Sequence, residues 1–163
     1  KSVALTRQMI GHSLAEARQT IWDLRSPTLK RGGLVAAIRE QVAALPNPSS
    51  CGIELQVSGA PCRLSGDMEH GLFRIAQEAV TNALKHGHPR HCKVAVDFRE
   101  RAVQLRVQDD GSGFELSAVP GDGKLHFGLL GMRERANKIG AVLDIRSQPG
   151  EGAVVEVTAE ITP

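Results

Sequence analysis

Hydrophobic positions recur along this chain with two periods, one of three to four residues and one of two residues. These are the periods of amphipathic helices and of half-buried strands. Helical spacing covers residues 2–24, 34–45, 68–86 and 132–139. Alternation covers residues 53–57, 93–100, 102–108, 142–147 and 153–161. The pattern therefore predicts the order helix, helix, strand, helix, strand, strand, helix, strand, strand.

The segments between these patterns carry turn signals. Pro27 ends the first helix, because the residue before a proline is pushed out of the helical region. Short charged or glycine-containing turns at residues 99–101 and 148–152 join neighbouring strands, and residues 110–124, which lack periodicity, are expected to form a loop. Pairing of strands that are adjacent in sequence favours an α+β sandwich, a sheet with helices on one face, over a doubly wound parallel sheet.

The chain of 163 residues fits one core domain with an appendage. We expect residues 28–163 to form the core domain and residues 1–27 to form one long helix before it. The apolar stripe of this helix predicts a partner helix from outside the sequence or from a second copy; the alternative is that the helix caps the core domain. Because Lys1 falls within a helical pattern, the chain is expected to be a piece of a longer protein.

Composition narrows the class of function. The net charge of +2 and the absence of a basic run interleaved with aromatic residues argue against nucleic-acid binding. Three cysteines without a paired spacing favour a reducing compartment, and no apolar run approaches the roughly 20 residues that cross a bilayer. These features predict a cytoplasmic setting.

Three polar motifs carry the candidate chemistry, and the first lies on the helix predicted for residues 68–86. Glu78, Asn82 and Lys85 are spaced i, i+4 and i+7, which places them within about 60° of one another around the axis. The Asn82 oxygen suits Mg²⁺, Lys85 suits phosphate, and Glu78 is placed to act as a base or to orient a metal-bound water. The alternative is a solvated polar face.

The second and third motifs are rich in glycine. Asp109 follows a predicted strand and opens the run Asp109-Asp110-Gly111-Ser112-Gly113, where it can accept a hydrogen bond from an exocyclic amine such as that of adenine. Gly128 and Gly131 precede the helix predicted for residues 132–139, where unpaired backbone N–H groups attract phosphate. A simple turn and a flexible connector are the respective alternatives.

The three motifs in this order resemble the catalytic, ATP-binding domain of sensor histidine kinases, in the superfamily that includes the gyrase, chaperone and mismatch-repair ATPases. The resemblance covers residues 34–161, with residues 73–86 similar to the N box, 109–113 to the first glycine box and 128–135 to the second. The runs Gly131-Met132-Arg133-Glu134-Arg135 and Trp22–Pro27 are similar to the nitrate-sensor and desaturase-thermosensor branch.

The resemblance implies a Bergerat-type two-layer sandwich with a mixed sheet, and a role for each motif. Asn82 would hold Mg²⁺ directly and Glu78 would act through a water, both as catalytic residues, while Lys85 and His86 would contact the phosphates. Asp109 would bind the adenine amine. The remaining nucleotide contacts would come from Gly111, Gly113, Gly128, Leu129, Leu130, Gly131 and Met132.

The implied activity is ATP-dependent phosphorylation of a histidine, followed by transfer to an aspartate in the receiver domain of a response regulator. Residues 1–27 resemble the second helix of the dimerisation and phosphotransfer domain, through which an inner-membrane parent would form a homodimer. The family's acceptor context, of Glu-Leu-His-Asp type, does not occur here, and His12 is interpreted as a helix-surface histidine. This chain alone is therefore expected to bind ATP without phosphorylating itself.

Two further departures from the family's pattern concern the affinity for nucleotide. His126 stands where the family often has a glycine, and Ala153 stands where it often has a threonine. Two rival interpretations stay open. The first is an ATP-hydrolysing clamp of the gyrase or chaperone kind, in which Glu78 activates water; the second is a dimerising scaffold that binds no nucleotide.

Overall fold

The strands of the described residues form one five-stranded sheet in the order β1-β2-β3-β5-β4. The structure is a computed structural model that describes residues 27–45, 51–118 and 124–161. The helix expected over residues 2–24, which includes His12, lies outside that part of the chain. The strands are β1 (Gly52–Ser58), β2 (His91–Arg99), β3 (Ala102–Asp109), β4 (Val142–Ser147) and β5 (Ala153–Glu160).

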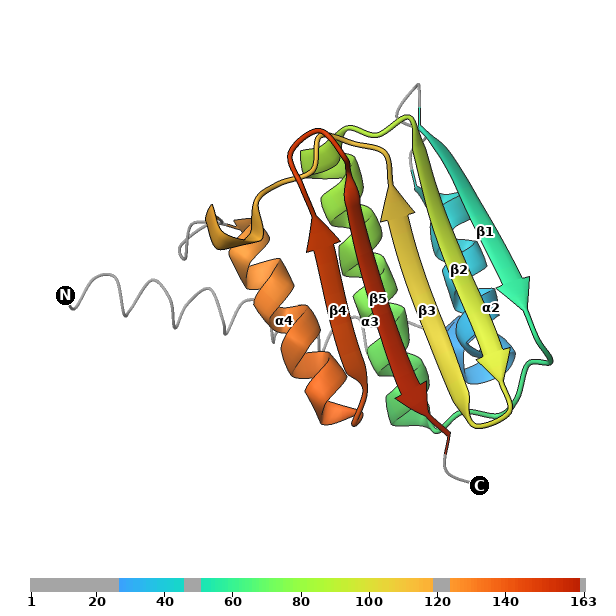
Figure 1. The fold of residues 1–163 in the computed structure, drawn as a ribbon. Coiled ribbons are helices and arrows are strands. Elements are labelled where there is room, and N and C mark those ends of the chain that lie inside the picture. The colour runs from blue at the N-terminus through green and yellow to red at the C-terminus, as the bar shows by residue number, and fades with distance from the viewer. Residues whose placement is uncertain (1–26, 46–50, 119–123, 162–163) are drawn as a thin grey trace.

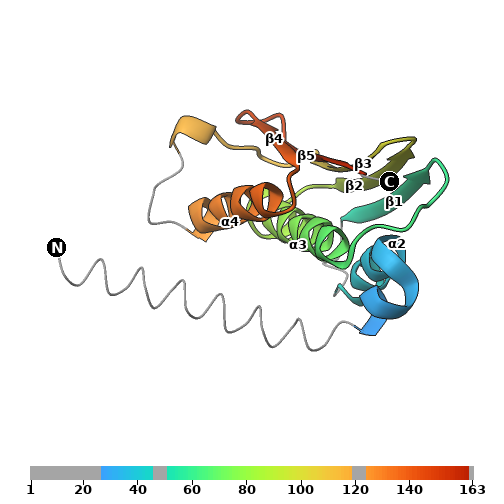
Figure 2. The same cartoon turned by 90° about the horizontal axis from the view of Figure 1, so that it is seen from below.

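The three α-helices lie on one face of this sheet. They are α2 (Pro27–Ala44), α3 (Gly66–Asn82) and α4 (Lys124–Lys138), with a π-helix η1 (Ala83–Gly87) and a short 3-10 helix η2 (Leu116–Ala118). Strands β1 and β2 run parallel, and the other neighbouring strands run antiparallel. Viewed along the sheet, the strands form one layer and the three α-helices form the second (Figure 2). The mixed two-layer α+β sandwich expected from the sequence is confirmed.

The core lies between the two layers and is mainly aliphatic. Alternate residues of β2 and β3 face the helices, and Val94, Val96 and Val103 have no exposed surface. Helix α3 packs onto them through Leu72 and Ile75, which are also fully buried. Burial of such side chains contributes about 1.5–3 kcal/mol each, so α3 is the helix that holds the layers together.

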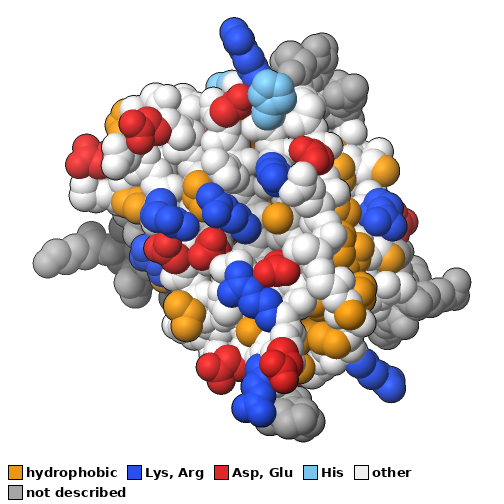
Figure 3. Space-filling view, turned by 45° about the vertical axis from the view of Figure 1, so that its right-hand side comes forward, with side chains coloured by type: hydrophobic (Ala, Val, Ile, Leu, Met, Phe, Trp, Pro, Cys, Tyr) orange, Lys and Arg blue, Asp and Glu red, His pale blue; other side chains and the backbone are white. Residues whose placement is uncertain are grey.

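The opposite face of the sheet is polar and carries ion pairs between strands. Glu156 on β5 lies within 3.8 Å of Arg106 on β3 and 3.7 Å of Arg146 on β4, and Arg146 also pairs with Asp144 at 2.9 Å. Figure 3 shows acidic and basic side chains interspersed over this face. The face is therefore compatible with water, and the two-layer arrangement needs no third layer.

Helix α3 begins and ends as its sequence directs. Ser65 caps its first turn by accepting a hydrogen bond from the N–H of Met68 at 3.3 Å. After Asn82 the backbone widens into η1, where the N–H of His88 donates to the carbonyl of Ala83 at 3.1 Å. Such one-turn π-helices frequently occur at functional sites. None of the described helices is long and apolar enough to cross a membrane.

The expected start of the last helix is wrong. Residues 132–139 were predicted as the helix, with Gly128 and Gly131 ahead of it, but α4 begins at Lys124 and encloses both glycines. Each glycine in a helix costs about 1 kcal/mol relative to alanine. Packing overrides that cost, because Leu129 and Met132 are buried against the core on the same side of α4.

The two glycines of α4 have different surroundings, which gives a test of this packing. A Cβ on Gly131 would meet only the end of the Arg135 side chain, at 2.9 Å, whereas a Cβ on Gly128 would overlap the Glu78 carboxylate and lie 3.1 Å from Asn82 Nδ2. We therefore expect Gly131→Ala to raise the free energy of unfolding by about 0.5–1 kcal/mol. The free energy of unfolding of Gly128→Ala should be at least about 1 kcal/mol lower than that of Gly131→Ala. Urea denaturation of both variants measures this difference. Equal gains in the free energy of unfolding would contradict the close approach of α4 to α3.

Candidate functional site

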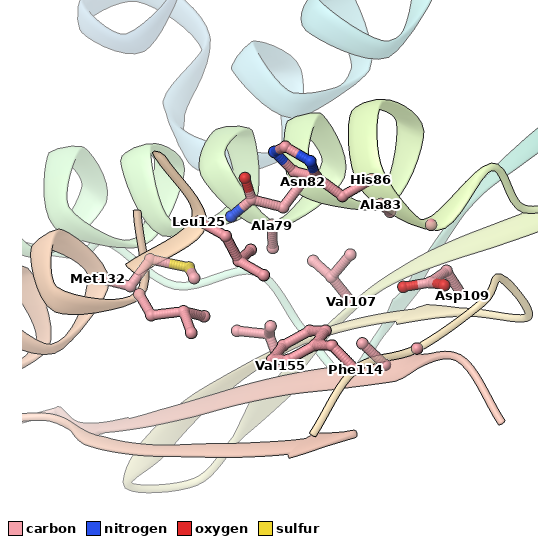
Figure 4. A pocket seen from close by; sticks show the side chains of 14 residues that line it. Ala79, Asn82, Ala83, His86, Val107, Asp109, Phe114, Leu125, Met132 and Val155 are labelled. Carbon is pink, nitrogen blue, oxygen red and sulfur yellow. The ribbon is translucent and has the colours of Figure 1, made fainter. Parts of the chain in front are cut away.

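A pocket of about 140 Å³ opens between the end of α3, the start of α4 and strands β3 and β5. Most of its wall is apolar, and three polar side chains, Asn82, His86 and Asp109, reach it (Figure 4). The lining residues are Ala79, Asn82, Ala83, His86, Gly87, Val107, Asp109, Gly113, Phe114, Leu125, Leu129, Met132, Ala153 and Val155. An apolar slot with a few convergent polar groups is the usual form of a small-molecule site.

Asp109 is the buried polar group of this pocket. It is the last residue of β3 and is 8% exposed. Its Oδ1 accepts a hydrogen bond from the N–H of Gly111 at 2.8 Å. Burial raises the pKa of Asp109, and hydrogen bonds from the backbone of Gly111 and Ala153 oppose that rise only in part. An ionised carboxylate is a pure acceptor, so this group suits a ligand that presents an N–H donor.

Glycines make room for Asp109 because three backbone segments meet around it. A Cβ on Gly111 would lie 2.5 Å from the carbonyl oxygen of Gly87, and Gly113 has φ 58° and would press a Cβ onto the carbonyl oxygen of Gln148. The N–H of Ser112 donates to the Gly87 carbonyl at 2.8 Å and so ties two of these segments together. The predicted need for glycine at 111 and 113 therefore has a backbone cause.

Asp110 holds this loop in place from outside the pocket. Its Oδ1 accepts the N–H groups of Arg90 and His91, each at 2.8 Å, and its Oδ2 lies 2.8 Å from Nδ1 of His91. These hydrogen bonds, first of all that from the His91 backbone, lower the pKa of Asp110 to about 2. The sequence motif contained Asp110, but only the structure shows that it anchors the turn between β3 and Gly113.

The predicted triplet on α3 divides between two environments. Asn82 lines the pocket, with His86 beside it in η1, while Lys85 is exposed and Glu78 is half-buried, and neither of these two belongs to the lining. The π-helix explains the position of Lys85, because it changes the angular spacing after Asn82 on which the shared face of the triplet was argued. Asn82 and His86 therefore form the polar wall opposite Asp109.

Helix α4 supplies apolar lining. Leu129 and Met132 belong to the wall, as does Leu125, for which the sequence predicted no role. Gly128, Gly131 and the exposed Leu130 lie in α4 but are not part of the lining. Gly111, which lies near Asp109, is not part of the lining either. The other apolar members, such as Phe114 and Val155, carried no signal beyond hydrophobicity.

The polar end of the pocket fits a magnesium ion that is bound chiefly through its ligand. Asn82 Nδ2 is buried and has no hydrogen-bond partner among the described residues, and the oxygen of the same amide is of the hard type that Mg²⁺ prefers. No group of three His, Cys, Asp or Glu side chains that would hold a metal by itself occurs in residues 27–45, 51–118 and 124–161. Mg²⁺ commonly takes only one or two protein oxygens and completes its shell with phosphate and water.

The pocket can therefore hold an elongated ligand with two unlike ends. A flat apolar ring that carries an amine fits the slot with its donor toward Asp109. An anionic chain with a hard cation fits the end formed by Asn82 and His86. The sequence motifs predict the same two functions for these residues.

Comparisons with known proteins agree with this geometry. Residues 67–163 match the family described as histidine kinase-, DNA gyrase B- and HSP90-like ATPase. The chain is 31% identical over 162 residues to the histidine-protein kinase/phosphatase DegS of Brevibacillus brevis, covering 99% of this chain and 41% of that protein. It is 30% identical to the sensor histidine kinase LiaS of Bacillus subtilis, covering 100% of this chain and 44% of that protein. The chain thus spans less than half the length of these relatives.

Solved structures show the same fold. The histidine kinase AdeS of Acinetobacter baumannii superposes with a TM-score of 0.65 at 12% identity, covering 96% of this chain and 84% of that chain. Full-length ShkA in complex with AMPPNP superposes with a TM-score of 0.64 at 21% identity, covering 80% of this chain and 30% of that chain. The chain belongs to the histidine kinase-, DNA gyrase B- and HSP90-like ATPase family, and the curated relatives that it matches over almost its whole length are histidine kinases.

Proposed function

We propose that the pocket binds Mg-ATP with the adenine amine on Asp109 and the phosphates toward Asn82 and His86. In the whole protein, the bound ATP phosphorylates a histidine on a helix that precedes this domain, and the phosphoryl group passes to an aspartate of a response-regulator receiver domain. Residues 1–27 belong to the second helix of the dimerisation and phosphotransfer domain, and residues 28–163 form the ATP-binding domain, which works in the cytoplasm.

One observation carries this proposal above the others. Asp109 is a carboxylate buried in a largely apolar slot, and its pKa is raised because burial disfavours its charge. A charged group held in a costly buried environment inside a pocket is a functional candidate. An adenine amine would supply the donor, while the apolar walls would enclose the ring.

The phosphate end uses few protein groups. Mg²⁺, when bound, neutralises phosphate charge and aligns the phosphoryl group for attack. The Asn82 carboxamide oxygen would hold the ion, with Glu78 one turn away to orient its water. His86 on the pocket wall and the exposed Lys85 would contact the phosphates, Lys85 by turning inward. Phosphoryl transfer depends mainly on such positioning and charge neutralisation, so this division of roles suffices.

The amine contact predicts a large loss of affinity in Asp109→Asn. The variant removes a charge-assisted hydrogen bond, so Mg-ATP affinity should fall by about 10–100-fold in isothermal calorimetry. Asp144→Asn, which removes an exposed carboxylate on β4, is the matched control and should bind as the wild type does. Wild-type affinity in Asp109→Asn would remove the basis of the proposal, and no binding to the folded wild-type chain would favour a scaffold.

Asn82→Ala should weaken binding at the phosphate end of the pocket and leave binding at the adenine end unchanged. Loss of the amide should weaken Mg-ATP at least about tenfold and leave adenosine binding within about twofold, because adenosine has no phosphates to hold a cation. Chelation of Mg²⁺ should lower ATP affinity in the wild type and have little further effect in the variant. An equal loss for both ligands would indicate that Asn82 supports the fold of the pocket instead.

Asp109 also predicts a pH dependence of stability. Its folded pKa is raised, so the folded state holds the proton more tightly than the unfolded state, whose pKa is near 3.9. The contribution of Asp109 to the free energy of unfolding should therefore fall as pH rises from about 4 through the folded pKa. Asp109→Asn lacks this fall, so its stability relative to the wild type should increase over that range. Urea denaturation between pH 4 and 7 would contradict this if the difference were constant.

A further inference from the structure

Helix α2 is interrupted at Gly33. This residue has φ 71° and ψ −175°, a conformation that is essentially restricted to glycine. The preceding Gly32 has no room for a side chain either, since a Cβ there would lie 2.6 Å from Cβ of Ala36. Helix α2 therefore consists of two segments, residues 27–32 and 34–44, which meet at a bend built by two glycines.

The second segment belongs firmly to the ATP-binding domain. Leu34, Ala37 and Ile38 are 2–3% exposed and pack into the core beside α3. In the first segment, Leu29 is only partly buried against that core. The bend at Gly33 thus separates the first segment, on its N-terminal side, from the second segment, which is packed into the domain.

Glu69, from the first turn of α3, holds this bend. Its carboxylate accepts a hydrogen bond from the N–H of Leu34, and its Oε1 lies 3.2 Å from the position that a Cβ on Gly33 would take. Leu34 begins the second segment, where backbone N–H groups have no partner within the helix. A carboxylate at this end also interacts favourably with the helix dipole. Glu69 is therefore a cap supplied by a neighbouring helix.

The same helix connects this cap to the nucleotide site. Glu69 lies in the first turn of α3 and Asn82 is its last residue, about 20 Å away along the axis. Because α3 is one continuous helix whose buried residues run from Gly71 to Val80, the bend and the pocket are attached to the same element. The angle at Gly33 then sets the direction in which residues 27–32 leave the domain.

We propose that Glu69 is a positioning residue of the kinase, which fixes the angle at which the chain before Leu34 leaves the ATP-binding domain. This inference rests on the proposed function, in which the acceptor histidine lies on that preceding part of the protein. Transfer requires the imidazole and the γ-phosphate to be held in line, and small misplacements lower the rate strongly. A hydrogen bond between α3 and α2 sets this geometry without contacting either reactant.

The test uses the intact parent kinase with Glu69→Ala, Glu69→Gln and, as a matched control, Asp67→Ala. Asp67 is an exposed carboxylate in the same turn of α3. Glu69→Ala should lower the maximal autophosphorylation rate at saturating ATP by about tenfold or more, the equivalent of one charge-assisted hydrogen bond. Its affinity for a non-hydrolysable ATP analogue should stay within about twofold. Glu69→Gln keeps an acceptor oxygen and should retain at least about half of the rate, as should Asp67→Ala.

Hydrogen exchange on the same proteins reports the bend independently of activity. Amides at Leu34 and the following turn should exchange about tenfold faster in Glu69→Ala than in the wild type or Asp67→Ala. An unchanged maximal rate in Glu69→Ala, or an equal fall in Glu69→Gln, would overturn the positioning role. A parent that binds no ATP analogue would instead refute the proposed function, and unchanged exchange at Leu34 would then refute the cap on its own.

Discussion

Burial of one carboxylate at the end of a strand is the constraint around which the site is organised. Asp109 ends β3 inside the sandwich, and the backbone around it has to come unusually close to accommodate its hydrogen bonds. Glycines at 111 and 113 permit that approach, and Asp110 ties the turn to β2. Burial of the Asp109 carboxylate lowers the stability of the domain, and a ligand amine bound to it would offset that loss.

Helix α3 connects the separate functions of the domain. Its middle forms the core through Leu72 and Ile75, and its end widens into a π-helix that presents His86 beside Asn82. Its first turn supplies Glu69 to the bend in α2. A single helix thus connects the pocket to the bend at Gly33.

The sequence predicted the strands well, because one face of the sheet is buried and alternation is then unavoidable. It also placed Asp109 at a strand end. It failed at the start of α4, where the apolar residues around Gly128 and Gly131 form enough contacts to override two glycines. The π-helix after Asn82 was not foreseen, and neither was the bend at Gly33, although Gly32-Gly33 is a local turn signal. The apolar lining, for example Phe114, was missed because hydrophobicity alone does not distinguish a pocket wall from the core.

The central claim is that Asp109 recognises the amine of adenine, and a comparison of ATP with ITP tests it most directly. ITP carries a carbonyl oxygen in place of that amine, which would face the carboxylate as a second acceptor. The account predicts that the wild-type chain prefers Mg-ATP by at least about tenfold, and that Asp109→Asn loses this preference because its amide can donate to the oxygen. Equal affinity of the wild type for both nucleotides, or an undiminished preference in the variant, would contradict the account.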